Sequence, residues 1–440
     1  MRPTLAASAS AAAERKLPVL GRLVDVRGPE VAGLLWGFLY MFALLYGYYL
    51  LRPVREEMGI RGDPGKLQWV FTATFVVMLG AVPLYSALVA RVPRRRAVPW
   101  VYRFFVLHLV VFRALIRAGV APPWVARAFF VWVSVYNLFV VSVFWSLLAD
   151  VFTSGQAKRL FGFIAAGGTA GGLLGSATVA WLAGRVGVAN IVLLSAALLE
   201  LAAWCATGLA RWARRGPAPD AGAPGRRDES ALGGSAWAGF AAIARSPYLL
   251  GIAAHMLLFA LASTFLYFSL ARTVAAAFPT PAARAALFAN VDLVIGLLAL
   301  GTQSVATGRI VAAVGLRGAL ASVPAMTIGG FAVAAALPGL WTLAIFQTLR
   351  RALHFAVDRP AREVLFTVAA PEDKYKAKSF VDTFVYRGGD ALGGWLYTLL
   401  AGLGLALPAL AVAAIPLGFL SLALAMWLAR RERGLEEGRA

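Results

Sequence analysis

Long runs of apolar residues, separated by short polar stretches, occupy most of this 440-residue chain. A helix needs about 20 mostly apolar residues to cross the hydrocarbon core of a bilayer. Twelve stretches approach that length, and we expect each of them to be a membrane-spanning helix. They lie at residues 31–51, 67–90, 98–116, 122–150, 160–183 and 188–210, and then at 247–271, 285–307, 319–337, 341–357, 379–402 and 408–429.

The pattern of the first six stretches is repeated in the second six. AKRLFGFIAAGGTAGG at residues 157–172 has a counterpart in AKSFVDTFVYRGGDALGG at residues 377–394, with displacements of 220 to 222 residues. Residues 86–95 and 308–317 form a second pair at a displacement of 222. Two matches at nearly one displacement predict two related halves of six helices each.

The composition supports a membrane protein. Hydrophobic residues make up 60% of the chain, charged residues 14%, and the mean hydropathy is +0.74. A soluble domain would have about 45–50% apolar and about 25% charged residues. The net charge of +21 is spread along the whole chain, which argues against nucleic acid as a partner. The single cysteine, Cys205, lies in an apolar run and is expected to be buried.

The basic residues also predict the orientation. With both termini in the cytoplasm, the termini and the even-numbered loops hold 28 of the 42 Lys and Arg, the odd-numbered loops 8, and the spans 6. This asymmetry follows the positive-inside rule. We therefore predict an inner-membrane protein with these parts: a cytoplasmic segment 1–30, a six-helix half 31–210, a basic flexible linker 211–246, a six-helix half 247–429 and a cytoplasmic tail 430–440.

This layout is typical of the major facilitator architecture, an all-α membrane fold of two pseudo-symmetric six-helix halves. Such transporters commonly carry a G-x-x-x-D-R-x-G-R-R loop after the second and eighth spans. Degenerate copies are present at both places. The matching residues are Arg91, Arg94 and Arg95 in the first copy and Gly308, Gly315 and Arg317 in the second.

Charged residues inside the spans are the candidates for function, because a charge in the bilayer is costly unless it faces a cavity or a partner. Asp382, Tyr386 and Asp390 are spaced four apart in the eleventh span, which predicts one helix face, and Arg387 is close enough to pair with Asp390. This face suits a polar substrate or a proton, or else an internal ion pair. The other candidates are Arg103, Arg113, Arg127, Asp150, Glu200, Asp292, Arg350 and Arg351.

A second cluster follows the first span, where Pro53 is expected to end the helix. Arg52 and Arg55 are placed to bind the oxygen atoms of an anion, although anchoring at the membrane interface explains them equally well. Asn137 in the fourth span, Arg351 in the tenth and Lys378 before the eleventh complete the predicted site.

No cofactor or metal site is predicted. His108, His255 and His354 are scattered without metal-ligand spacing. His354 and Asp358 form an H-x-x-x-D motif, which we interpret as the cap of a helix end. The chain contains no G-K-[ST] sequence, so ATP-driven transport by this chain alone is not expected.

Three segments resemble motifs of the bacterial and plastid ATP/ADP translocases, in the same order. LLRPVREEMG at residues 50–59 resembles L-R-x-x-K-D-x-L. FWSLLADVFTSGQAKRLF at residues 144–161 resembles the F-W-x-F-A-N stretch that ends in [DE]-A-K-[KR]. KAKSFVDTFVYRGGDALGG at residues 376–394 resembles K-x-K-x-x-[ID]-x(5)-R-x-G-K-x-G-G.

The resemblance implies a major facilitator fold and the exchange of ATP against ADP. Three positions depart from the motifs: Arg55 replaces a lysine, Asp390 stands where the binding lysine is expected, and Val133 stands where a glutamate is expected. We therefore expect a monomeric transporter, not an enzyme, that exchanges nucleotide or another anionic metabolite by alternating access. A proton-coupled carrier of a non-nucleotide metabolite, drug or lipid is one alternative, with Asp292, Asp382 and Asp390 as the acids. A membrane-embedded enzyme or a non-transporting subunit is another.

Overall fold

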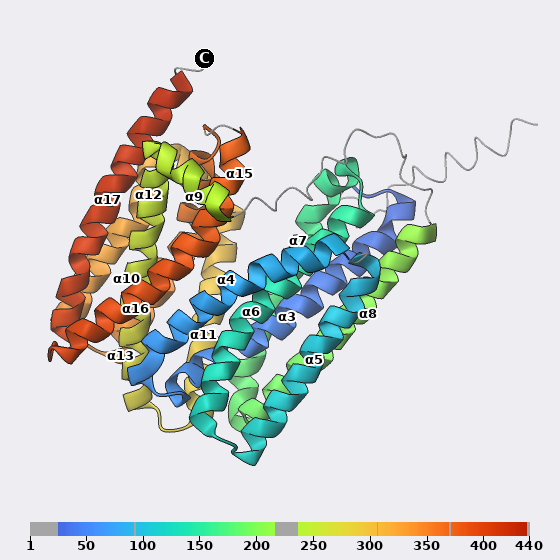
Figure 1. Ribbon diagram of the computed structural model, residues 1–440, viewed down its shortest axis with the longest axis horizontal. Helices are drawn as coiled ribbons and strands as arrows, with labels where there is room; N and C mark the ends of the chain where they lie inside the picture. The colour runs from blue at the N-terminus through green and yellow to red at the C-terminus, as the bar shows by residue number, and fades with distance from the viewer. Residues whose placement is uncertain (1–24, 92–93, 216–235, 306, 369–370, 438–440) are drawn as a thin grey trace, which may run out of the picture. The chain divides into compact units, whose positions relative to one another are not determined.

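The computed structural model describes residues 25–91, 94–215, 236–305, 307–368 and 371–437. The described residues are almost entirely helical (Figure 1). The first half contains η1(Gly28–Glu30), α3(Val31–Arg61), η2(Pro64–Lys66), α4(Leu67–Arg91), α5(Arg94–Ala118), α6(Pro122–Val151), α7(Ser154–Val186) and α8(Val188–Arg215). The second half contains α9(Ala236–Arg245), α10(Pro247–Ala277), α11(Pro281–Val305), α12(Thr307–Ala336), α13(Leu340–Leu353), η4(His354–Asp358), α14(Arg359–Leu365), α15(Pro371–Phe380), η5(Val381–Val385), α16(Tyr386–Gly402) and α17(Leu407–Glu437).

Ten helices of the described chain are long and apolar enough to cross a membrane. The predicted spans 341–357 and 379–402 are not among them, because each is assembled from shorter pieces. α13 has 14 residues and continues into η4, and α16 has 17 residues and follows η5. Both η4 and η5 are π-helical, a local geometry that is frequent at functional sites.

Several predicted helix ends differ from the observed ones. α3 passes through Pro53 without a break and continues to Arg61, so the prediction that Pro53 ends the first helix is wrong. Proline removes one backbone hydrogen bond, and here the helix tolerates that loss. In the predicted linker, residues 211–215 belong to α8 and residues 236–245 form α9, whereas residues 216–235 lie outside the described part.

α12 contains a kink at Gly315, where φ is 65°. This left-handed backbone conformation is readily adopted only by residues without a Cβ atom. Gly315 is one of the residues that match the loop motif after the eighth span. At this motif position the backbone of the chain therefore favours glycine. The apolar helix that follows the kink is the predicted ninth span.

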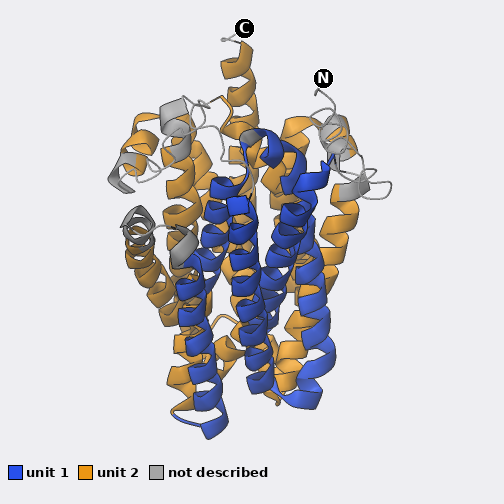
Figure 2. Ribbon diagram, turned by 90° about the vertical axis from the view of Figure 1, so that its right-hand side faces the viewer, with its two compact units in different colours: residues 1–54, 87–120, 136–229 blue, residues 55–86, 121–135, 230–440 orange. Residues whose placement is uncertain are grey.

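The chain divides into two compact units, which Figure 2 shows in different colours. Unit 1 comprises Met1–Val54, Ala87–Val120 and Tyr136–Glu229, and unit 2 comprises Arg55–Ser86, Ala121–Val135 and Ser230–Ala440. Unit 2 therefore holds the whole described second half together with parts of α3, α4 and α6 from the first half.

Unit 1 is held together by close helix packing that depends on glycine. The predicted repeat places glycines along α7, and Gly171 faces α3. A Cβ atom on Gly171 would overlap the carbonyl oxygen of Phe42 and lie 2.9 Å from the backbone nitrogen of Tyr46. Small residues allow helix backbones to approach in this way inside membranes.

Gly171→Ala should lower the free energy of unfolding by about 1–3 kcal/mol, because the added methyl group meets backbone atoms that cannot rotate away. Gly162→Ala is the matched control on the same helix, since nothing lies within 4 Å of its added Cβ. This control should be neutral or should stabilise by up to about 1 kcal/mol. Equal effects of the two substitutions on unfolding in mixed micelles would contradict the packing argument.

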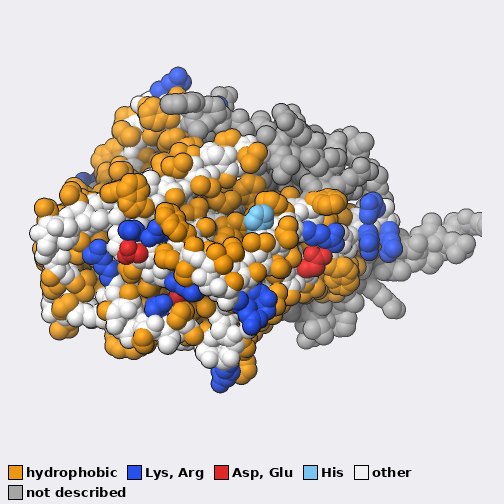
Figure 3. Space-filling view, turned by 60° about the horizontal axis from the view of Figure 1, so that its bottom comes forward, with side chains coloured by type: hydrophobic (Ala, Val, Ile, Leu, Met, Phe, Trp, Pro, Cys, Tyr) orange, Lys and Arg blue, Asp and Glu red, His pale blue; other side chains and the backbone are white. Residues whose placement is uncertain are grey.

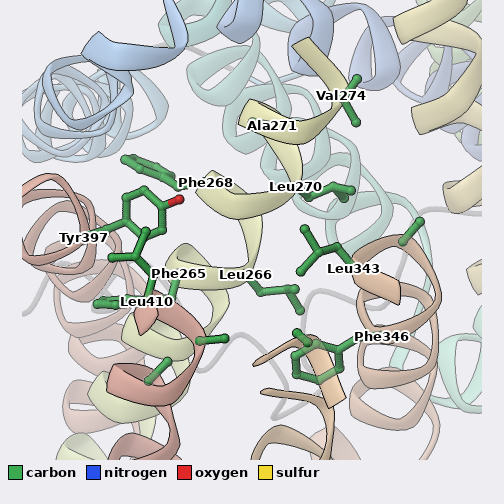
Figure 4. Close-up of a cluster of buried hydrophobic side chains, with 14 of the residues drawn as sticks. Phe265, Leu266, Phe268, Leu270, Ala271, Val274, Leu343, Phe346, Tyr397 and Leu410 are labelled. Atoms are coloured by element: carbon green, nitrogen blue, oxygen red, sulfur yellow. The ribbon is translucent and has the colours of Figure 1, made fainter. Parts of the chain in front are cut away.

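The core of unit 2 is built from aromatic and aliphatic side chains on α10, α13, α16 and α17. Phe265 and Phe268 of α10 pack edge-to-face on Tyr397 of α16, with ring centroids 5.5 and 5.4 Å apart (Figure 4). Leu343 and Phe346 of α13 belong to the same buried cluster (Figure 4). α17 packs along α12 as well as α10 (Figure 1). Hydrophobic side chains are spread over the face shown in Figure 3, with small groups of Lys and Arg among them, as expected for a lipid-facing helix bundle.

Candidate functional site

Arg55 lies near the end of α3, in the part of that helix that belongs to unit 2. Its Nη2 atom is 2.6 Å from Oε1 of Glu56, and its Nη1 atom donates a 3.4 Å hydrogen bond to Oγ of Ser134 on α6. The guanidinium carbon lies 4.7 Å from the centre of the Phe130 ring. Only 16% of the side chain is exposed, so Arg55 is a largely buried cation held from several sides.

Asp390 is the buried carboxylate of α16, with 7% exposure. Its Oδ1 atom accepts a 3.3 Å hydrogen bond from Oγ1 of Thr264 on α10, and its Oδ2 atom lies 3.3 Å from Nη1 of Arg387. The predicted pairing of Arg387 with Asp390 is confirmed. Asp390 also interacts electrostatically with Arg55. Within unit 2, the carboxylate of Asp390 therefore interacts with Arg55, which belongs to the first half of the chain, and with Arg387, which belongs to the second half.

The predicted common face of Asp382, Tyr386 and Asp390 is wrong for Asp382 alone, because Tyr386 and Asp390 both lie in α16 and interact electrostatically. Asp382 lies in η5, which is π-helical and thus adds about one residue to a helical turn, so Asp382 no longer lies above Tyr386. Asp382 is exposed whereas Asp390 is buried. The electrostatic neighbours of Asp382 are Arg362, Lys378, Glu363 and Arg359, so it belongs to the charged ends of α14 and α15.

Two further predicted residues are paired elsewhere in unit 2. Nη1 of Arg351 on α13 lies 2.9 Å from Oδ1 of Asp292 on α11, and the Asp292 side chain is 4% exposed. Lys378 of α15 forms an ion pair with Glu363 of α14. Neither partner is identifiable from the sequence, because each lies on a different helix.

The other two residues of the predicted site, Arg52 and Asn137, lie in unit 1. The Arg52 guanidinium carbon lies 5.7 Å from the centre of the Tyr49 ring on α3. Asn137 is a partly buried residue of α6. Arg55 and Arg52 are thus close in sequence but belong to different units, and Asn137 belongs to unit 1 whereas Asp390 belongs to unit 2.

A buried ion pair between α3 and α11 was not predicted. Nη2 of Arg284 lies 2.9 Å from Oε1 of Glu57, and the exposed fractions of the two side chains are 11% and 0%. Arg284 also donates to the carbonyl oxygens of Phe278 and Pro279. The sequence pattern offered no reason to single out Glu57, and its burial shows that other side chains of the protein cover this position.

The tenth span contains a second set of buried charges. Arg350 is 2% exposed, and His354 lies 2.9 Å from Asp358 within η4. This pair lies inside a continuous helical path from α13 to α14, so the interpretation of the H-x-x-x-D motif as a helix cap is wrong. Among the described residues, no group of three or more His, Cys, Asp or Glu is placed to hold a metal ion.

No family model and no curated protein matches the sequence. Solved structures do match it. A bacterial homolog of the human lysosomal transporter Spinster has a TM-score of 0.61 and 13% identity, covering 93% of this chain and 98% of its own. A bacterial homologue of the iron transporter ferroportin has a TM-score of 0.63 and 12% identity, covering 91% and 98%. The nucleoside transporter NupG has a TM-score of 0.57 and 14% identity, covering 91% and 98%.

These similarities define an all-α, multi-pass membrane fold. More narrowly, the chain has the twelve-helix fold of the major facilitator type, as the arrangement of its apolar segments predicted. Identities of 12–14% show this fold and do not show which substrate the chain binds.

Proposed function

We propose that this chain is a secondary transporter that exchanges an anionic small molecule across the inner membrane by alternating access, in the manner of the ATP/ADP translocases. The observation that carries this proposal is the position of Asp390 under the influence of both Arg55 and Arg387. An anion that enters beside Asp390 meets guanidinium groups contributed by both halves. Guanidinium groups bind phosphate and carboxylate oxygens in bidentate geometry.

The cluster around Asp390 combines the properties that a transport site needs. Its charges are buried, yet each is balanced by a partner that a substrate can replace: Glu56 for Arg55, and Asp390 for Arg387. Substrate sites of such transporters lie near the midplane, where helices of the two repeats meet. The three motif resemblances support nucleotide as the anion, and the distribution of Lys and Arg supports cytoplasmic termini.

A second candidate is a proton-coupled carrier of a metabolite that is not a nucleotide. It is favoured by the hydrogen bond between Thr264 and buried Asp390, because a neutral carboxyl group can keep this bond after its charge is lost. The lysine of the ATP/ADP translocase motif is also absent at this position.

The test of the proposed function is binding and counter-exchange with a defined panel: ATP, ADP, other nucleotides, inorganic phosphate and uncharged metabolites. A ligand at about 100 times its dissociation constant should add about 2.7 kcal/mol to the stability of the folded protein. The same ligand should drive exchange in reconstituted vesicles.

The Arg387→Ala variant should lose the stabilisation, since it removes the cation that the second half contributes to the cluster. Arg185→Ala is the control, because Arg185 lies over Trp181 at the exposed end of α7. Stabilisation by uncharged metabolites alone would contradict an anion site. Equal losses in the two variants would contradict the assignment of Arg387.

A further inference from the structure

An exposed ion pair lies on the surface of unit 1, between α5 and α8, which pack side by side (Figure 1). Nε and Nη2 of Arg103 on α5 both donate to Oε1 of Glu200 on α8, at 3.3 and 3.2 Å. The two side chains are 60% and 46% exposed. Both were candidates for function in the sequence, and neither belongs to the cluster around Asp390.

The ion pair lies within the membrane-spanning part of both helices. Glu200 is 12 residues from the first residue of α8 and 15 from the last, so it is near the middle of a span. Arg103 lies within the apolar stretch Val98–Ala118 of α5. An arginine side chain is long enough to extend to the membrane interface. Here the guanidinium group bonds to Glu200 instead, so its charge is held in the apolar region.

The side chains around the pair are apolar and exposed. On α5, Trp100 and Phe104 share the helix face of Arg103. On α8, Trp204 follows Glu200 by four residues and is also exposed. Exposed apolar side chains are ordinary on a helix that faces lipid. An exposed ion pair is not ordinary there, because charged side chains within membrane spans almost always face a cavity or a partner.

The pair also has hydrogen-bonding groups that it does not use. Both donor atoms of Arg103 meet the same carboxylate oxygen. Among the residues that the structure describes, Nη1 of Arg103 and Oε2 of Glu200 therefore have no hydrogen-bond partner. Polar groups without a partner are costly in hydrocarbon, where no water replaces the missing bond. A partner that covers this surface should supply one acceptor and one donor at the depth of the pair.

We propose that this surface is the interface of a homodimer, in which a second copy of this chain covers the ion pair. A two-fold axis parallel to the membrane normal brings the same residues of both copies to one depth. Arg103 of each copy then faces Glu200 of the other, so the charges alternate in sign. The unused donor of one copy meets the unused acceptor of the other. This dimer replaces the monomer that we expected from the sequence.

A second copy suits this surface better than a lipid headgroup does. The pair has no net charge and offers one donor and one acceptor, so it is complementary to itself across a two-fold axis. A lipid phosphate would attract Arg103 but repel Glu200, and headgroups lie at the membrane interface rather than near the middle of a span. Hydrogen bonds between polar side chains of neighbouring helices contribute to helix association in membranes. The inference is independent of the proposed function, because it uses no residue of the cluster around Asp390.

The dimer is tested by resonance energy transfer between full-length chains that carry a donor or an acceptor fluorophore at the C-terminus. The chains are reconstituted in phosphatidylcholine vesicles at decreasing protein-to-lipid ratios. The wild type should show more transfer than random proximity gives. Arg103→Glu and Glu200→Arg should each raise the dissociation constant about 100-fold, because only like charges then meet across the interface. An equal mixture of the two variants should restore the transfer, since opposite charges then face each other between the copies.

Two further variants decide the result even if a charge reversal impairs folding. Arg103→Met/Glu200→Met leaves no uncompensated charge, so it should fold but remain monomeric. Lys66→Glu is the matched control, because Lys66 and Asp63 form an ion pair of similar exposure, 56% and 47%, in a loop. This control should associate like the wild type.

Three outcomes would overturn the homodimer. The first is equal energy transfer in the wild type and in Arg103→Met/Glu200→Met. The second is wild-type transfer no greater than random proximity gives. The third is wild-type transfer that disappears when phosphatidylglycerol is added to the vesicles, which would assign the ion pair to a lipid headgroup instead.

Discussion

Replacing Glu57 with Gln is expected to lower the free energy of unfolding by about 3–5 kcal/mol. Glu57 has no exposed surface, and its carboxylate lies 2.9 Å from the guanidinium group of Arg284. The substitution leaves a buried cation without its counter-charge, which is the costly case for an internal ion pair. Unfolding in mixed micelles measures the effect.

The double variant Glu57→Met/Arg284→Met should recover most of this stability, because no uncompensated charge remains. Asp63→Asn is the control in the same region. Asp63 pairs with Lys66 at 3.9 Å on the exposed loop, so its loss should cost less than about 1 kcal/mol. The single variants Glu57→Met and Arg284→Met complete the comparison. If the double variant loses as much free energy of unfolding as the two single variants lose together, Glu57 and Arg284 are not directly coupled.

The same pair should also control access to the site. Glu57 comes from the first half and Arg284 from the second, so the proposed alternating access requires their separation. In the predicted layout both residues lie in odd-numbered loops, which the proposed orientation places on the outer side. In Glu57→Gln, a cysteine introduced at Ser134 should react about tenfold faster with an impermeant maleimide, corresponding to about 1.4 kcal/mol of lost closure. Cys205 is buried and contributes little background.

The apolar runs predicted the positions of the helices well, because every helix that crosses a bilayer needs a long run of apolar side chains. The fourth span was predicted at 122–150, and α6 covers Pro122–Val151. Helix extensions were not predictable in this way. α3 continues to Arg61 beyond its apolar run, because its last turns, with Glu57, are buried against other helices of unit 2 rather than lying in lipid.

The π-helical segments account for most errors at the candidate site. The choice between four and five residues per hydrogen-bonded turn depends on tertiary packing, which the residue spacing does not report. Thus Arg387 and Asp390, both within α16, were paired correctly, whereas Asp382 was assigned to the wrong face. Partners from distant helices were also missed: Glu57 and Arg284 are 227 positions apart, and Asp292 and Arg351 are 59 apart.

Arg55→Ala is expected to weaken anion binding by about 30-fold or more, since truncating one partner of a buried charge pair costs about 2–5 kcal/mol. The loss has two parts. First, the guanidinium group that the first half contributes near Asp390 is removed. Second, the carboxylate of Glu56, which lies 2.6 Å from Arg55, stays buried without its counter-charge. Removing Glu56 as well, in Arg55→Ala/Glu56→Gln, should relieve the second part but not the first. Titration of each variant with ATP and ADP measures the difference.

Arg55→Lys distinguishes the two properties of the arginine. Lysine keeps the charge but loses the planar donor group that stacks on Phe130 and reaches Ser134. The ATP/ADP translocase motif has a lysine at this position, so a site that works in the same manner should retain binding within about tenfold of the wild type. A loss as large as that of Arg55→Ala would mean that the planar geometry of Arg55, and not its charge alone, recognises the anion. The resemblance to the translocases would then not extend to how the substrate is held.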